Sequence, residues 1–204
     1  VKDGVQRLTE MQLSDGGWGW FSGYGEHSYP HTTAVVVHGL QLAKANDVAL
    51  VPGMLEKGVE WLKRYETKEV ERLKRGDQVR DKKGDWQKIR DYKLQADNLD
   101  ALVYYVLSDA DHKNNAMNEY LYRDRTHLAV YAKALFGLGL HKHQDKVKLD
   151  MILRNIAQFV VVDDENQTAY LKLPQDNWWW SWYGSEVEAH SFYLKLLSAV
   201  EPKN

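Results

Sequence analysis

The sequence has 204 residues, of which 44% are hydrophobic, and this is enough for one domain of ordinary size with a substantial core. Its 27 basic and 29 acidic residues give a formal net charge of -2, so no net field favours nucleic acid or an anionic membrane as a partner. The absence of cysteine excludes disulfides, zinc–thiolate sites and cysteine nucleophiles within these residues. The longest apolar runs are far too short to span a bilayer, so we expect no direct membrane insertion.

Apolar spacing in the first third of the chain predicts helices of two kinds. Residues 5–13 predict a short amphipathic helix that ends at the Gly16–Gly17 pair. Residues 31–45 are apolar on nearly every side, which predicts a helix buried all round. Residues 54–64 instead alternate apolar and charged side chains and predict an amphipathic helix with one wet face.

The same contrast recurs in the rest of the chain. Residues 99–107 and 128–140 are largely apolar, residues 146–159 have separate wet and dry sides, and residues 187–200 return to the apolar kind. Residues 168–173 alternate weakly and predict a short strand or an extended loop. No other sustained strand pattern is present, so the sequence predicts an all-α protein.

The most charged segment covers residues 66–91. Because charges of both signs are interleaved in it, we interpret it as a solvated helix end and loop, in preference to a basic docking site for an acidic partner.

The alternation of the two kinds of helix predicts an architecture. Helices that are apolar all round need protein on every side, and amphipathic helices can cover them, so the sequence predicts an inner layer wrapped by an outer one. Inner and outer helices that alternate along the chain form an α/α toroid. With neighbouring helices roughly 8–10 Å apart, four inner helices form an arc more easily than a closed ring. Either the pattern leaves further helices undetected or the ring is truncated, and we expect an incomplete ring.

Two segments, 15–45 and 176–200, repeat one plan: an aspartate, an aromatic run, a glycine, polar residues and an apolar helix. We expect each loop to fold its indoles over the end of the helical layers as a lid, and the alternative is a platform for a carbohydrate or another small molecule. On either interpretation, the candidate pocket or interface residues are the aromatic ones of these loops: Trp18, Trp20, Phe21, Trp178, Trp179, Trp180, Trp182 and Tyr183.

Polar candidates for catalysis or metal binding are few. Glu186, Glu188 and His190 are candidate pocket residues and offer acid and base groups, but residues two apart on a helix point in different directions, so we expect one glutamate to act as an N-terminal cap or charge. His31 and His38 are separated by two helical turns, roughly 10 Å, which is too far for both to bind one metal ion. Without a phosphate loop or a catalytic triad, we expect no catalytic residue, no metal, no cofactor and no enzymatic activity.

Five stretches in order carry a family resemblance: QRLTEMQLSDGGWGWF, HTTAVVVHGLQLAKAN, MLEKGVEWLKR, THLAVYAKALFGLGLHK and GSEVEAHSFYLKLLSAVEP. Together they span nearly the whole chain, and they resemble the thioester-containing domain of the alpha-2-macroglobulin and complement superfamily, in a bacterial style. The resemblance implies that residues 1–204 are one toroid fragment of a larger protease trap, a broad-spectrum inhibitor that works in the periplasm or outside the cell. Its partners would be target proteases, reached through the parent protein, and neighbouring domains of the same parent.

The sequence departs from this family in its reactive chemistry. Family members form a thioester between the cysteine and the glutamine of a Cys-x-Glu-Gln motif, and this chain contains neither the motif nor any cysteine. We expect that the motif precedes these residues in the parent, and the alternative is a member that has lost it. Complement-like members also use a histidine, which would fall within residues 80–97, and that stretch has none. A thioester in the parent is therefore expected to react directly with amines.

Two other functional classes stay open on the sequence alone. One is an α/α-toroid enzyme that acts on a glycan or an isoprenoid, which requires a deep pocket holding a carboxylate. The other is a non-enzymatic interaction module whose exposed tryptophan loop docks on another domain.

Overall fold

The computed structural model describes residues 2–21, 25–173 and 186–201, and these are mostly helical. The α-helices of the described residues are α1 (Lys2–Met11), α2 (Pro30–Ala45), α3 (Met54–Arg80), α4 (Asn98–Asp109), α5 (Asn115–Arg123), α6 (Val130–Lys142), α7 (Lys146–Ala157) and α8 (Glu186–Val200). They are joined by two short 3-10 helices, η1 (Trp86–Lys88) and η2 (Arg125–His127), and one hairpin of β1 (Val160–Asp163) and β2 (Thr168–Leu171). The predicted all-α class is confirmed.

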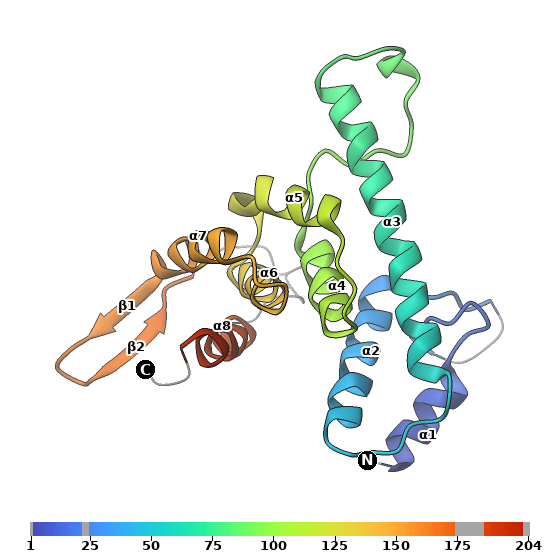
Figure 1. Ribbon diagram of the computed structural model, residues 1–204, viewed down its shortest axis with the longest axis horizontal. Coiled ribbons are helices and arrows are strands. Elements are labelled where there is room, and N and C mark those ends of the chain that lie inside the picture. The colour runs from blue at the N-terminus through green and yellow to red at the C-terminus, as the bar shows by residue number, and fades with distance from the viewer. Residues whose placement is uncertain (1, 22–24, 174–185, 202–204) are drawn as a thin grey trace.

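Four helices form a row in which each contacts the next: α2 packs on α4, α4 on α6, and α6 on α8 (Figure 1). The helices that lie between them in the sequence pack against this row. Helix α3 contacts α2 and α4, α5 contacts α3 and α4, and α7 contacts α6. The hairpin projects from the end of the molecule where α7 and α8 lie (Figure 1).

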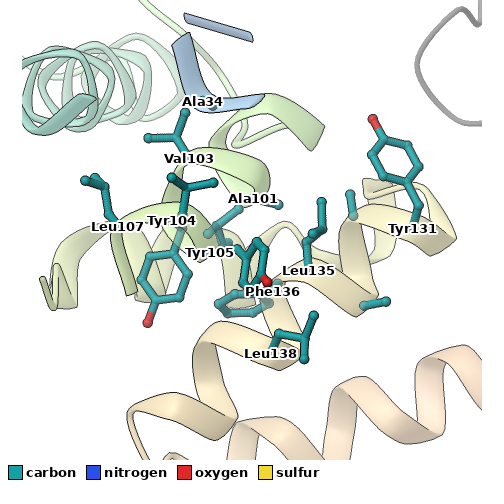
Figure 2. Packing of buried hydrophobic residues seen from close by; sticks show 14 of the residues in the cluster. Ala34, Ala101, Val103, Tyr104, Tyr105, Leu107, Tyr131, Leu135, Phe136 and Leu138 are labelled. Carbon is teal, nitrogen blue, oxygen red and sulfur yellow. The ribbon is translucent and has the colours of Figure 1, made fainter. Parts of the chain in front are cut away.

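The centre of the row, α4 and α6, holds the densest part of the core. Every residue of α6 from Val130 to Leu140 is buried, because neighbours surround this helix on all sides. The rings of Tyr104 and Phe136 meet edge to face, with centroids 5.6 Å apart (Figure 2). Gly139 brings the two helices close, since a Cβ there would lie 2.7 Å from the Tyr104 ring. The prediction of buried helices at residues 99–107 and 128–140 is confirmed.

Two of the helices predicted to be buried all round are not. On α2, Val35 and Leu42 are 51% and 47% exposed, and on α8, Val187 and Leu194 are 75% and 64% exposed. Both helices lie at an end of the row, so each has a row neighbour on one side only. An apolar side chain is covered only where another element lies next to it, and here the described residues provide none.

The interpretation of residues 66–91 as a solvated helix end and loop was wrong for its first half. Helix α3 continues to Arg80, and Glu66 and Glu69 on it are buried. Burial is possible because both carboxylates have partners: Glu66 accepts hydrogen bonds from His112 and Asn114, and Glu69 pairs with Arg72 and Lys93. Beyond Arg80 the chain is a largely exposed loop, as expected.

The sequence prediction missed two short elements. Helix α5 is nine residues long and has three buried residues, so it offers too short a stretch for a periodicity argument to single it out. Strand β1 is four residues long and pairs antiparallel with β2, with Val160 opposite Leu171. The strand predicted within residues 168–173 is confirmed as β2, and residues 164–167 form the turn.

No helix among the described residues is long and apolar enough to cross a membrane.

Candidate functional site

The first aromatic loop is anchored by Trp18. Its indole is 1% exposed and donates a hydrogen bond from Nε1 to the carbonyl oxygen of Leu8, at 2.8 Å. The ring packs against Gly58 of α3, where a Cβ would lie 2.8 Å from it. Trp18 is therefore a core residue, in agreement with the structural interpretation of the aromatic run.

Asp15 holds the same loop to α3. Its Oδ2 accepts a hydrogen bond from Nε1 of Trp61 at 2.8 Å, and its Oδ1 accepts one from the hydroxyl of Ser28 at 2.7 Å. The guanidinium of Arg64 donates to the Asp15 carbonyl oxygen at 2.7 Å. These three hydrogen bonds hold the start of the loop against α3.

Trp20 and Phe21 do not act as a buried lid. They are 61% and 59% exposed, so the expectation that the first loop buries its aromatic run is wrong for these two. The Trp20 ring meets the ring of Tyr29 edge to face, at a centroid distance of 6.2 Å. The remaining aromatic candidates lie outside the described residues: Trp178, Trp179, Trp180, Trp182 and Tyr183.

Trp20 and Glu188, which are far apart in the sequence, line one cavity of about 1030 Å³. The first turns of all four row helices contribute to its wall, through Pro30 of α2, Asn98 of α4 and Tyr131 of α6 as well as Glu188 of α8. We call it the four-helix cavity. All four row helices therefore begin beside this cavity.

The wall of the four-helix cavity is mainly apolar and aromatic, with rings from Trp20, Tyr29, Tyr131 and Phe192. A mainly apolar wall with a few polar groups is typical of a site that binds a ligand or packs against another segment.

Burial shifts the pKa of three ionisable groups of the cavity, and a fourth, Asp97, is paired. Burial lowers the pKa of His31 and of His38, and burial raises the pKa of Glu188. Asp97 caps α4, accepting from the backbone N–H groups of Leu99 and Asp100, and its other oxygen lies 2.8 Å from Lys93. Asp97 and Glu188 are the two carboxyl groups that line the cavity, and Asp97 is the one that caps a helix.

Glu186, Glu188 and His190 are not brought together as an acid/base group. Glu188 lines the four-helix cavity, whereas Glu186 and His190 line a separate hollow of about 690 Å³ beside the hairpin. This is the divergence expected for residues two apart on a helix. Both glutamates lie in the first turn of α8, where negative charge is favourable.

His190 joins the hairpin to α8. Its Nε2 accepts a hydrogen bond from the Leu171 N–H at 2.9 Å, so Nδ1 carries the proton and donates to the carbonyl oxygen of Glu186 at 2.6 Å. With both ring nitrogens engaged, His190 is a structural tie in this arrangement.

Among the described residues, no three or more histidine, aspartate or glutamate side chains lie close enough together to hold a metal ion.

Sequence reasoning missed most of the cavity wall, including Tyr29, His31, Asp97, Tyr131 and Phe192. Several of them share one signal, because they lie at or near the start of an apolar helix. A position at a helix start predicts a cavity residue only when the starts of the four helices are known to lie together.

Comparison with protein-family models found no match, and neither the curated proteins nor the solved structures contain a significant match to this chain.

Proposed function

We propose that the chain is the scaffold of a thioester-type domain, an α/α toroid with an incomplete ring, in a macroglobulin-like protease trap. The observation that carries the proposal is the arrangement of the row. Helices α2, α4, α6 and α8 alternate in sequence with helices that cover them, and all four begin at one cavity. A toroid requires inner helices covered by the helices that intervene in the sequence, and the family resemblance of the same stretches supplies the function.

Both ends of the row support the incomplete ring. Val35 and Leu42 on α2 are exposed, and so are Val187 and Leu194 on α8. In a closed ring, apolar side chains at these positions would be covered by further inner helices. We therefore propose that other segments of the parent protein complete the ring.

In this proposal the 204 residues contribute no covalent chemistry. They contain no cysteine, so any thioester comes from another part of the parent. The chain's role is to support the reactive segment and to dock on neighbouring domains, and the parent, placed in the periplasm or outside the cell, binds the target proteases.

The main alternative is a toroid enzyme that uses the four-helix cavity. The carboxyl group of Glu188, whose pKa is raised by burial in a largely apolar wall, is the observation in its favour. Hydrolytic or cyclising chemistry generally needs a second acid or base, and Asp97 is occupied by its cap and by Lys93. Saturable binding of an oligosaccharide or an isoprenoid, weakened by Glu188→Gln, would favour the enzyme instead.

The proposal is tested on the parent protein. Its reading frame is expected to encode Cys-x-Glu-Gln, and incubation with a protease is expected to give an adduct that survives denaturation in detergent. Pretreatment with a small primary amine serves as the control, because it consumes a thioester and should abolish the adduct. A parent without the motif that leaves proteases unmodified and fully active would contradict the proposed trap.

A further inference from the structure

The hairpin of β1 and β2 has backbone groups that point away from it. The Lys172 N–H donates to the Phe159 carbonyl oxygen at 2.8 Å, so these two residues form a hydrogen-bonded pair of the antiparallel ladder. The next pair is Val160 with Leu171, and hydrogen-bonded and non-hydrogen-bonded pairs alternate along such a ladder. The N–H and C=O groups of Val160 and Val162 therefore point away from β2. We call these four backbone groups the β1 edge.

The opposite edge of the hairpin already has a partner. By the same alternation the Leu171 N–H points outward from β2, and it donates to Nε2 of His190 on α8 at 2.9 Å. The hydrogen bond agrees with the alternation, and it shows that β2 faces α8. The β1 edge, in contrast, has no hydrogen-bond partner among the described residues. Because the hairpin projects from the molecule beyond α7 and α8 (Figure 1), this edge is open to an incoming strand.

The chemistry of the β1 edge selects an extended polypeptide. A β-strand presents N–H and C=O groups at the spacing of the edge, whereas a helix satisfies its own groups internally. Edge strands are commonly protected by lysine, proline or a bulge, and β1 has none of these. Val162 is 63% exposed, so an added strand would also cover apolar surface. A two-stranded hairpin is only marginally stable by itself, and a third strand would stabilise it.

The turn that follows the β1 edge is acidic. Asp163, Asp164 and Glu165 are consecutive, and residues 160–171 contain no lysine or arginine. Hydrogen bonds from the Asn166 side chain and backbone lower the pKa of Asp163, so this carboxylate is ionised at neutral pH. A strand with basic residues beside the turn would therefore be attracted, and one with acidic residues there would be repelled.

We propose that the β1 edge binds an extended segment of another polypeptide, which adds to the hairpin as a third, antiparallel strand and carries basic residues beside the acidic turn. Antiparallel addition continues the ladder of the hairpin and places the N-terminal end of the bound segment next to Asp164 and Glu165. Residues 174–185 of this chain contain no basic side chain and do not meet this requirement. The inference rests on the hairpin and does not depend on the proposed function.

Backbone pairing supplies the affinity in this mode of binding, and the charges of the turn select the sequence. Only one short edge takes part, so the contact falls at the small end of protein interfaces, where complexes are transient. Binding is therefore expected to be weak and to exchange rapidly.

A labelled peptide, Lys-Lys-Thr-Val-Thr-Val with blocked ends, tests the proposal, and fluorescence anisotropy measures its binding to the 204-residue chain. We expect saturable binding, and binding weaker by at least about tenfold when glutamate replaces both lysines. Two further peptides carry N-methyl groups on alternate amides, one peptide for each alternation. Because only every second N–H of an added strand faces β1, one methylation pattern should abolish binding and the other should preserve it.

Variants of the edge test the same contact from the side of the protein. Val162→Pro removes one outward N–H at a position where an edge strand tolerates proline, and it should weaken binding of the lysine peptide by at least about tenfold. Val162→Thr keeps the N–H and a β-branched side chain, so it is the matched control and should bind like the unchanged chain. Asp164→Lys combined with Glu165→Lys should reverse the preference, so that the glutamate peptide binds more tightly.

Amide NMR signals of Val161 and Tyr170, which form an inner pair of the ladder, establish that each variant keeps its hairpin. If Val162→Pro loses the hairpin, the methylated peptides and the charge-reversed variant decide the question. Absence of saturable binding, equal effects of the two methylation patterns, or unchanged binding to Val162→Pro with an intact hairpin would each overturn the proposal. Self-association of the unchanged chain that Val162→Pro abolishes would also overturn it, because a second copy would then occupy the edge.

Discussion

At the scale of single residues, the most unusual side chain is Glu66, a buried carboxyl group in the middle of α3. Its Oε2 accepts hydrogen bonds from Nε2 of His112 at 3.0 Å and from the Asn114 amide at 2.9 Å, while Oε1 has no partner among the described residues. Burial raises the pKa of Glu66, and the hydrogen bonds only partly oppose this. The group connects α3 to the turn between α4 and α5, and burial shifts its titration toward the protonated form.

The raised pKa predicts how stability changes with pH. The folded state binds the Glu66 proton more tightly than the unfolded state, where the pKa is near 4.5, so this contribution is complete below that pH and is lost as the pH rises through the folded pKa. Relative to Glu66→Gln, the unchanged chain is therefore expected to lose on the order of 1 kcal/mol between about pH 4 and pH 8. Urea unfolding of both proteins across this range measures the difference.

Glu71→Gln on the exposed side of the same helix is the control and should show a much smaller change. A stability difference between the unchanged chain and Glu66→Gln that grows in favour of glutamate as the pH rises would show that burial does not dominate at this site.

At the scale of elements, α3 is extended by its contact with the segment that returns from the exposed loop. The Lys93 N–H donates to the Arg72 carbonyl oxygen at 3.0 Å, and the Lys93 ammonium lies 2.6 Å from Asp100 and 3.1 Å from Glu69. Gly76 lies directly beneath this segment. The second half of α3 is therefore stabilised by a backbone that crosses it at close range.

The crossing predicts opposite effects at two helix glycines. Gly76→Ala would place a Cβ against the Lys93 carbonyl group, with 2.7 Å to its carbon, so the backbones must separate and we expect a loss of about 1–3 kcal/mol. Gly39→Ala meets open space and should gain up to about 1 kcal/mol. Thermal unfolding compares the two. A neutral or stabilising Gly76→Ala would mean that the returning segment is not held against α3.

At the scale of the whole molecule, the row divides the structure into a centre and two ends. Helices α4 and α6 have a row neighbour on each side, whereas α2 and α8 have one on one side only (Figure 1). Local opening costs least where fewest apolar contacts are lost. The ends of the row should therefore open more readily than its centre.

Hydrogen exchange measures this difference directly. We expect the backbone amides of α6 and α4 to exchange most slowly, and those of α8 to exchange at least roughly tenfold faster than those of α6. Equal protection of α8 and α6 would show that the row opens only as a unit.

The candidate site was predictable only in part. The aromatic loop pattern identified Trp18 and Trp20, and the helix start identified Glu188. Residue type alone, however, did not separate the buried Trp18 from the exposed Trp20, because both follow a glycine and only the contacts with Leu8 and Gly58 distinguish them.

The sequence by itself determined the helical class, the buried helices α4 and α6, and the contrast between these and the amphipathic helices α3 and α7, because these depend on the periodicity of apolar residues along one segment. Only the tertiary structure decided that α2 and α8 keep an exposed apolar face, that Glu66 is buried on α3, and that four helices begin at one cavity. Each of these depends on which segments, distant in the chain, lie beside one another. The type of a side chain, apolar or charged, does not reveal whether such a neighbour is present.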